Sequence, residues 1–244
     1  MYHREKSESC NHIANKLKKY GILTDMQSGK ISYSGNQSVN LYCKNLYFLR
    51  HGETEGTTSH RFMSAFSPNS CLTEKGRQQL LHVANKISQI DIDHILFSSI
   101  PRVKQTAEII RQNINQGYDF TELSWLIGID NTGWEGKTPK ELDGIDAEDF
   151  IEREKKHNIF ARSVRGSSWG QVLLCSITLI NYLNEHFSGK NVLLISQGSI
   201  LMGFQLLLHI HDEPWKKYDT DDFFCLKNNG QSTNYGKLKL IYHN

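Results

Sequence analysis

The segment LYFLRHGET, residues 46–54, joins a short apolar run to a turn that carries arginine, histidine and glycine. The run from Leu46 to Leu49 predicts a buried strand. Gly52 allows the backbone to turn tightly around a ligand directly after that strand. An imidazole at His51 beside the guanidinium of Arg50 suits an anionic substrate, because the guanidinium presents forked donors.

Strand and helix patterns alternate on the C-terminal side of this segment. Thr73 is suited to cap a helix, residues 94–99 predict a strand, and Pro101 begins a second helix. Further elements are expected at 172–187 (helix), 191–196 (strand), 200–209 (helix), 223–226 (strand) and 237–242 (strand). This alternation predicts an α/β fold with right-handed crossovers and a largely parallel sheet.

Domain organisation follows from a change of composition near residue 40. Residues 1–40 are polar, with Ile13, Leu17 and Tyr20 at helical spacing, and they predict an N-terminal extension to a domain at 41–244. We expect a solvated tail with one short helix, and a lid or a homodimer contact is the alternative. Residues 137–166 are charged and predict an irregular segment within the domain.

Composition excludes several classes of protein. Hydrophobic residues make up 38% of the 244 positions and charged residues 22%, which predicts a soluble globular protein. The net charge of +2 is spread along the chain, so nucleic acid is not an expected partner. No apolar run approaches the roughly 18 residues of a membrane span, and no secretion signal is evident. The five cysteines form no CxxC pair, so we expect reduced thiols in the cytoplasm.

A second strand end also carries a basic residue. Arg102 follows the predicted 94–99 strand in the first turn of a helix, close to the positive end of that helix. Ligands of open α/β sheets bind beyond the carboxyl ends of strands, so Arg50, His51 and Arg102 are expected to converge there. A neutral His51 could attack phosphorus while the arginines hold the phosphoryl oxygens. A histidine simply hydrogen-bonded within a loop is the alternative.

Four motifs in register resemble the histidine phosphatase superfamily, also called the phosphoglycerate mutase-like family. They are RHGE[ST] at 50–54, LTEKG at 72–76, RxxQTA at 102–107 and GWEG at 133–136, and the resemblance extends over about residues 44–244. It implies a three-layer αβα sandwich and a phosphohistidine mechanism without a metal or a cofactor. It also implies that His51 is the nucleophile, that Arg50 and Arg102 grip the phosphoryl group, and that 137–166 is an insertion that selects the substrate.

The chain departs from the family pattern at two catalytic positions. The second family histidine is replaced by Gln197 in Ser196-Gln197-Gly198, and the usual acid glutamate is replaced by Gly128. Gln197 can donate a neutral hydrogen bond but cannot titrate. Asp130 is the one nearby substitute acid, although a surface aspartate in a turn is the simpler interpretation.

Smaller departures fall in the same expected pocket. Thr57 and Ser64 replace an asparagine and a glycine, and Gly166-Ser167-Ser168 replaces a G-E-S motif. We count Thr57, Gln197 and Gly198 with Arg50, His51 and Arg102 as candidate phosphate-binding residues.

Three functions remain open at this point. The first is a divergent phosphomonoesterase that hydrolyses a small phosphorylated metabolite through phospho-His51. The second is a degenerate protein that binds phosphate esters, which would explain Gly128 and Gln197 together. The third is altered chemistry such as isomerisation or elimination, which the fold does not exclude. A mutase is less expected, because moving a phosphoryl group between substrate oxygens needs proton transfer at both ends.

Overall fold

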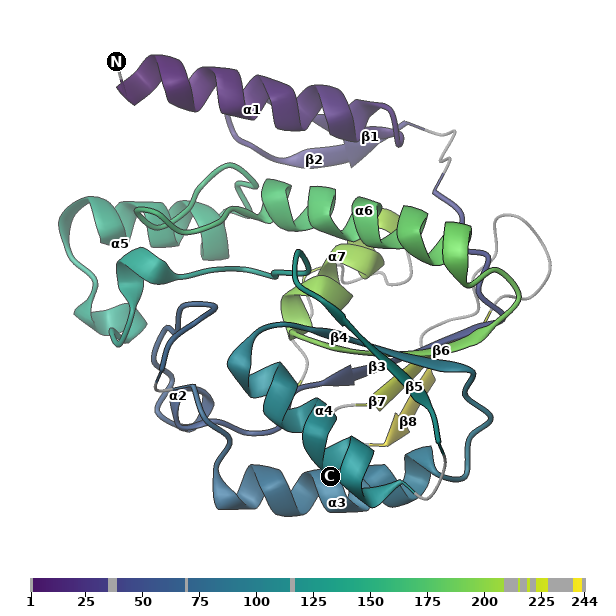
Figure 1. Ribbon diagram of the computed structural model, residues 1–244. Coiled ribbons are helices and arrows are strands. Elements are labelled where there is room, and N and C mark those ends of the chain that lie inside the picture. The colour runs from purple at the N-terminus through teal and green to yellow at the C-terminus, as the bar shows by residue number, and fades with distance from the viewer. Residues whose placement is uncertain are drawn as a thin grey trace.

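A mixed β-sheet forms the centre of the molecule in the computed structural model (Figure 1). The structure describes residues 2–34, 39–68, 70–114, 117–208, 215, 219, 223–227 and 239–242. Within these residues the sheet has six strands in the order β5-β4-β6-β3-β7-β8. Their bounds are β3 Asn45–Arg50, β4 His94–Ser98, β5 Asp119–Leu123, β6 Asn191–Ser196, β7 Phe223–Lys227 and β8 Lys239–Tyr242. Strands β5, β4, β6 and β3 run parallel, whereas β7 and β8 pair antiparallel at one side.

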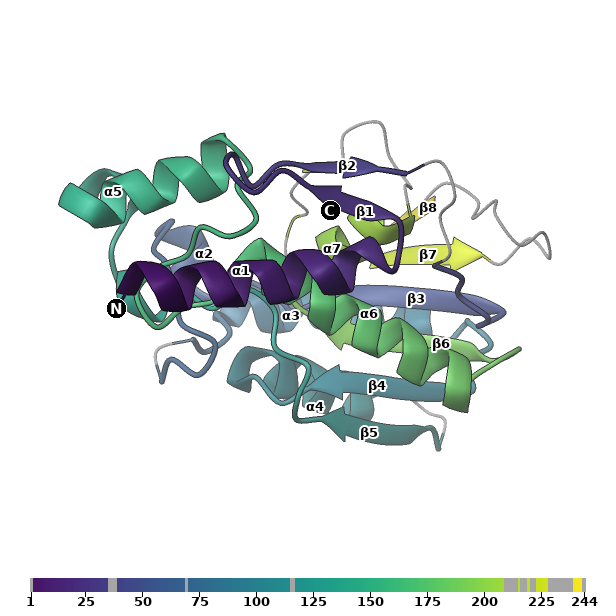
Figure 2. The ribbon, with the colours of Figure 1, turned by 90° about the horizontal axis from the view of Figure 1, so that it is seen from above.

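Helices cover both faces of this sheet, which confirms the predicted three-layer αβα sandwich (Figures 1 and 2). Helices α3 (Glu74–Ile87) and α4 (Pro101–Asn113) pack on one face, and α6 (Trp169–His186) and α7 (Gly198–Leu208) pack on the other. Strand β3 shows why both faces are apolar. Leu46 and Phe48 join the core under α6 and α7, while Leu49 joins the core under α3 and α4.

The insertion at 137–166 is more regular than its sequence suggests. It contains a 3₁₀ turn η2 (Pro139–Glu141), the helix α5 (Gly144–Phe150) and a π-helical turn η3 (Ile151–Lys155). A capping box formed by Thr138 and Glu141 begins the first of these elements. The expectation of a wholly irregular segment is therefore wrong, because mixed charges obscured the short helices.

The N-terminal extension packs onto the α6 layer (Figure 2). It forms α1 (Tyr2–Lys18) and a hairpin of β1 (Ile22–Thr24) and β2 (Ile31–Tyr33). Leu17 is fully buried in the same core as α6 and α7, and the Tyr33 hydroxyl donates to the Leu206 carbonyl at 2.9 Å. This packing differs from the solvated tail that the polar composition favoured.

The hairpin also reaches the insertion. The Ile159 N–H donates to the carbonyl of Gly29, in the turn between β1 and β2, at 3.1 Å. The Gly170 N–H, at the start of α6, donates to the carbonyl of the same Ile159 at 2.8 Å. The extension therefore braces the end of the insertion against α6.

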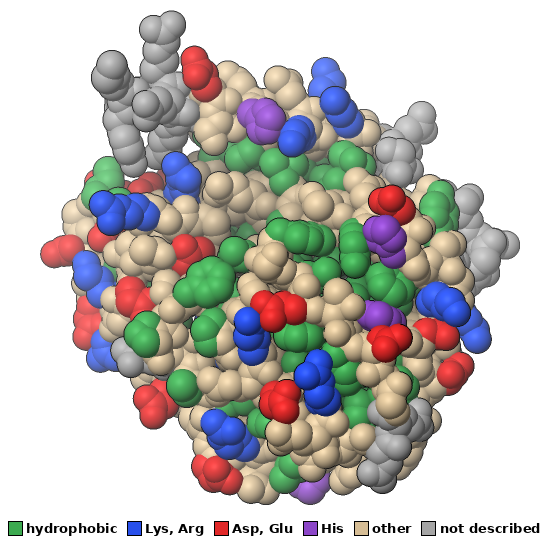
Figure 3. Space-filling model, in the orientation of Figure 1, with side chains coloured by type: hydrophobic (Ala, Val, Ile, Leu, Met, Phe, Trp, Pro, Cys, Tyr) green, Lys and Arg blue, Asp and Glu red, His purple; other side chains and the backbone are tan. Residues whose placement is uncertain are grey.

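The surface shows mixed charge on the face drawn in Figure 3, where acidic and basic side chains are interspersed. In the described part of the chain, no helix combines the length and the apolar character needed to cross a bilayer.

Candidate active site

Three of the predicted site residues meet at the carboxyl ends of adjacent strands. His51 follows β3, Gln197 follows β6, and Arg102 lies in the first turn of α4 after β4. The backbone N–H of His51 donates to the Ser196 carbonyl at 3.1 Å, so the β3–β6 pairing continues one residue past the end of β3. The sheet order, with β6 between β3 and β4, therefore brings these side chains to one edge.

The His51 imidazole is fixed from both ring nitrogens. Its Nδ1 lies 2.9 Å from the Gly52 carbonyl, and its Nε2 lies 3.2 Å from Nε of Arg102, which donates to it. Because a carbonyl can only accept, Nδ1 carries the proton and Nε2 presents its lone pair. Burial, followed by the charges of Arg102 and Arg50, holds the pKa of His51 well below its usual range. The ring is thus neutral at neutral pH, and its Nε2 faces Arg102.

Arg102 is held by the loop that follows α2 (Glu55–Thr58). Its Nη1 donates to the carbonyls of Ser64 at 3.3 Å and Ala65 at 3.4 Å, and the residue is only 6% exposed. Burial, reinforced by the charge of Arg50, lowers the pKa of Arg102 to about 10. The guanidinium therefore stays charged at neutral pH beside His51.

Arg50 is half-buried and lies against the start of α7. A Cβ atom at Gly198 would stand 3.3 Å from Nε and 3.4 Å from Cδ of Arg50, so any side chain at 198 would press on this arginine. The amino-terminal ends of α4 and α7 lie at the same edge of the sheet. Their partial positive charges add to those of the two arginines and favour an anion.

Gln197 and Gly128, the two departures from the family pattern, touch each other. A Cβ atom at Gly128 would lie 3.2 Å from Cδ of Gln197 and 2.2 Å from Oγ of Ser199. Ser199 Oγ is fixed there, because it accepts from the Ile129 N–H at 3.0 Å. Gln197 is 5% exposed, and its Nε2 has no hydrogen-bond partner among the described residues. The two replacements form one neutral subsite that keeps a free amide donor.

Asp130 is engaged in holding the surrounding loops. Its Oδ1 accepts from the Ala65 N–H at 2.8 Å, and its Oδ2 accepts from the Thr132 hydroxyl at 2.7 Å. The Asp130 N–H donates to Ser167 Oγ at 2.6 Å. Both carboxylate oxygens thus serve structure, and a role for Asp130 as a proton donor stays a prediction.

Thr57 caps the short helix α2. Its hydroxyl donates to the Thr54 carbonyl at 2.7 Å and accepts from the Thr54 N–H at 2.9 Å. The side chain therefore shapes the turn after His51, and its contact with phosphate stays a prediction.

The motifs contain further residues whose roles the sequence did not reveal. Gln105 Oε1 accepts from the Leu72 N–H at 3.0 Å, and Thr106 Oγ1 accepts from the Gly52 N–H at 3.2 Å. Both lie in the RxxQTA motif, which was the available signal. They tie α4 to the turn behind His51 and to the segment that precedes α3.

Glu135 of the GWEG motif anchors the loop that holds Arg102. It accepts a hydrogen bond from the Ser64 N–H. Partial burial acts to raise the pKa of Glu135, but hydrogen bonds from Ser67 and Ser64 and the charge of Arg102 keep it below its usual value. Glu135 is therefore an anion that balances part of the positive charge of Arg102.

An aromatic cluster fastens the insertion to the same loop. The ring of Phe62 lies 5.1 Å from that of Trp134 and 5.8 Å from that of Phe150, measured between centroids. The guanidinium carbon of Arg153 lies 4.3 Å from the ring centroid of Trp134, and the indole N–H of Trp134 donates to Asp146 Oδ1 at 3.0 Å. These contacts fix α5 and η3 beside the site.

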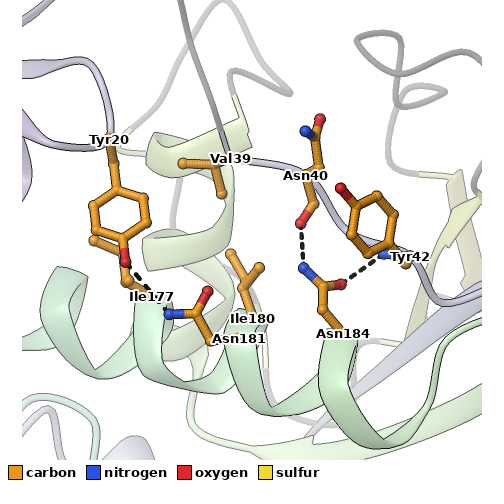
Figure 4. A pocket seen from close by; sticks show the side chains of 8 residues that line it. All are labelled: Tyr20, Val39, Asn40, Tyr42, Ile177, Ile180, Asn181 and Asn184. Carbon is orange, nitrogen blue, oxygen red and sulfur yellow. Dashed lines mark hydrogen bonds between the residues drawn. The ribbon is translucent and has the colours of Figure 1, made fainter.

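A separate pocket of about 200 Å³ lies between the extension and α6 (Figure 4). Asn184 spans its wall, donating to the Asn40 carbonyl and accepting from the Tyr42 N–H, each at 2.7 Å. Asn40 and Tyr42 precede β3, so the pocket lies at the opposite edge of the sheet from His51. Its lining of tyrosine, asparagine and apolar side chains does not match the anion site.

The model of the histidine phosphatase superfamily (branch 1) matches residues 46–225, which include all of the site described above. The chain belongs to this superfamily. Among curated relatives, "Probable phosphoglycerate mutase GpmB" of Escherichia coli is 40% identical over 67 residues, which are 28% of this chain. The match spans only 30% of that relative.

Solved structures of phosphatases share this fold. The alpha-ribazole phosphatase of Shigella flexneri has a TM-score of 0.67 and 19% identity, covering 80% of this chain and 95% of that one. The mycobacterial glucosyl-3-phosphoglycerate phosphatase has a TM-score of 0.66 and 20% identity, covering 82% of this chain and 99% of that one. At such identities the likeness concerns the fold alone.

Proposed function

We propose that this superfamily member is a divergent phosphomonoesterase that acts on a small phosphorylated metabolite through a phosphohistidine on His51. The arrangement of the imidazole carries this proposal. With Nδ1 bound to the Gly52 carbonyl and Nε2 facing Arg102, the ring is a preformed nucleophile next to a phosphoryl-binding cation.

The reaction has two steps. In the first, the Nε2 lone pair of His51 forms a bond to phosphorus, and the P–O bond to the alcohol breaks with its electrons on the leaving oxygen. In the second, a water oxygen attacks phosphorus, the N–P bond breaks, and the pair returns to Nε2. The proton lost by water balances the one gained by the alcohol, so the products are alcohol and phosphate.

The arginines act on the charge of the phosphoryl group. The group enters between His51 and Arg102, so the Arg102 Nε–H, which donates to His51 Nε2 in the structure, donates to a phosphoryl oxygen instead. Arg50 and the free amide of Gln197 supply donors from the α7 side. Because the Ser64 and Ala65 carbonyls already hold the Arg102 guanidinium, it can stabilise the transferring group with little reorganisation.

A substitution of the nucleophile tests the proposal. We expect purified protein to hydrolyse p-nitrophenyl phosphate, and His51→Ala to lower kcat by on the order of 10³-fold or more. His82→Ala, at an exposed position of α3, is the matched control. A denaturing quench followed by mass spectrometry should find an acid-labile phosphoryl adduct on the His51 peptide. Turnover that survives His51→Ala would contradict the proposal.

A second candidate is a protein that binds phosphate esters with little turnover. The contact between Gly128, Gln197 and Ser199 favours it, because the three together fill the space beside the nucleophile with neutral groups. Calorimetric binding of inorganic phosphate that needs Arg102, without any phosphoryl adduct on His51, would support this alternative over the first.

The same proposal extends to the substrate and to the cellular compartment of the protein. The neighbours named above suggest a small phosphate ester, and we propose a phosphorylated or anionic metabolite as the ligand. All five cysteines lie in described segments and none of them forms a disulfide there, which fits the cytoplasm that we propose as the compartment.

A further inference from the structure

Resting on the proposed phosphatase function, we infer that this site serves activated phosphoryl donors, whose leaving group departs as a stable anion; aryl phosphates are the simplest of these. Ordinary alkyl phosphates would be poor substrates, because an alkoxide needs a proton as it leaves. The inference rests on what the carboxylates around His51 contact, on the neutral subsite at Gln197, and on the excess of positive charge.

Among the described residues, the carboxylates near His51 are engaged as hydrogen-bond acceptors. Asp130 accepts from the Ala65 N–H and from Thr132, and Glu135 accepts from the Ser64 N–H. Each acts as an acceptor for donors of the loop that holds Arg102. A protonated carboxylic acid would lose part of these contacts.

Glu53, two residues after the nucleophile, is also committed. It accepts from the Thr73 hydroxyl at 2.8 Å and from Lys75 Nζ at 3.1 Å. Burial acts to raise the pKa of Glu53, but these donors keep it below its usual value. Among the described residues, each of these three carboxylates is therefore placed to hold structure and not to supply a proton.

The subsite beside Gln197 offers hydrogen bonds without acidity. Gly128 has no side chain. A Cβ atom added there would lie only 2.2 Å from Ser199 Oγ, so the hydroxyl takes up the space that a side chain would need. Gln197 presents a buried amide, whose N–H can donate to an oxygen but cannot release its proton at neutral pH.

Positive charge offers a different means of releasing the leaving group. Arg50 and Arg102 both lie close enough to His51 for their charges to act on its ring, and α4 and α7 direct their amino-terminal ends to the same edge. Fixed positive charge stabilises an oxyanion as it develops. It is sufficient for a phenolate, whose conjugate acid has a pKa of about 10, and insufficient for an alkoxide.

A series of phenyl phosphates with different ring substituents tests this inference. We expect kcat/KM, which reports the step up to P–O cleavage, to fall by on the order of 10²-fold from the nitro-substituted to the unsubstituted ester, and further for an alkyl phosphate. A shallow dependence, with alkyl phosphate hydrolysed within about tenfold of phenyl phosphate, would overturn the inference while the phosphatase function stands. No His51-dependent turnover of any ester would instead overturn the proposed function.

A pair of double variants sharpens the test. Gly128→Glu with Ser199→Gly places a carboxyl group beside Gln197 and removes the hydroxyl that would clash with it. We expect this variant to hydrolyse alkyl phosphate at least about tenfold faster than the wild type and to flatten the dependence on the leaving group. Gly128→Gln with Ser199→Gly has the same size without an acid and should show no such gain. Equal behaviour of the two variants, once circular dichroism shows both folded, would contradict the inference; if either fails to fold, the ester series decides.

Discussion

Gly128 sits where a single methyl group would collide with its surroundings. Gly128→Ala would place Cβ 2.2 Å from Ser199 Oγ, and we expect it to lower the free energy of unfolding by about 1–3 kcal/mol. Ser199→Ala removes that oxygen together with the bond from the Ile129 N–H, at a cost of about 1 kcal/mol. Urea unfolding of both single variants and the double variant should give a coupling of about 1 kcal/mol, with the double variant more stable than additivity predicts. Additive effects would show that the two residues do not compete for this space.

The buried His51 makes stability depend on pH. Its folded pKa is depressed below the unfolded value of about 6.5, so the unfolded chain binds a proton first as the pH falls. The contribution of His51 to the free energy of unfolding has its full value above about pH 6.5. Below that pH it decreases by up to about 1.4 kcal/mol per pH unit. His51→Gln cannot titrate, so its unfolding free energy should fall less steeply between about pH 6.5 and 5. Parallel profiles for the two proteins, measured by urea unfolding, would argue against a neutral buried imidazole.

Single residues also mark how far the sequence predicts the site. Arg50, His51, Arg102 and Gln197 could be placed at strand ends, because each ends or follows a recognisable strand. The contact of Gly128 with Gln197 could not be predicted, since it depends on how the segment after β5 lies across the start of α7. The engagement of Asp130 with Ala65 was hidden for the same reason, because the partner is a backbone N–H without a sequence signal.

The turn of the β1–β2 hairpin is fitted closely against the insertion. Gly29 has φ of +64°, and a Cβ atom there would lie 1.9 Å from Oδ1 and 3.1 Å from Cα of Asn158. Gly189 has φ of +74° but no atom within 4 Å of its Cβ position, so Gly189→Ala reports the backbone strain alone. We expect Gly29→Ala to cost about 1–3 kcal/mol more than Gly189→Ala in thermal or urea unfolding. Equal losses would mean that the hairpin does not press on the insertion.

Elements with a strong local pattern were predictable, and those fixed by long-range contact were not. The strand at 191–196 coincides with β6, and Thr73 and Pro101 lie at the starts of α3 and α4 as expected. Strand β5 was missed, because its sequence DFTEL has only one buried residue at the edge of the sheet. The hairpin of β1 and β2 was missed because its strands have three residues each.

The extension and the sandwich share one core, so they should unfold together. Leu17→Ala empties a fully buried position in that core, and we expect a loss of about 2–4 kcal/mol. Leu23→Ala, at a residue that is 40% exposed, is the matched control and should cost less than about 1 kcal/mol. Far-ultraviolet circular dichroism and tryptophan fluorescence should give coincident transitions in both variants. An early transition confined to the extension would show that it folds apart from the sandwich.

The hydrogen bond from Ile159 to Gly29 gives the hairpin a thermodynamic link to the active site. Insertion and hairpin share this bond, so a ligand that orders the insertion also lowers the rate at which the hairpin opens. Such linkage is reciprocal, because the free energy that ligand binding gives to the hairpin equals the free energy that an intact hairpin gives to binding. If phosphate slows amide hydrogen exchange in Ile22–Thr24, exchange in the hairpin reports that the active site is occupied, although these residues are not part of that site.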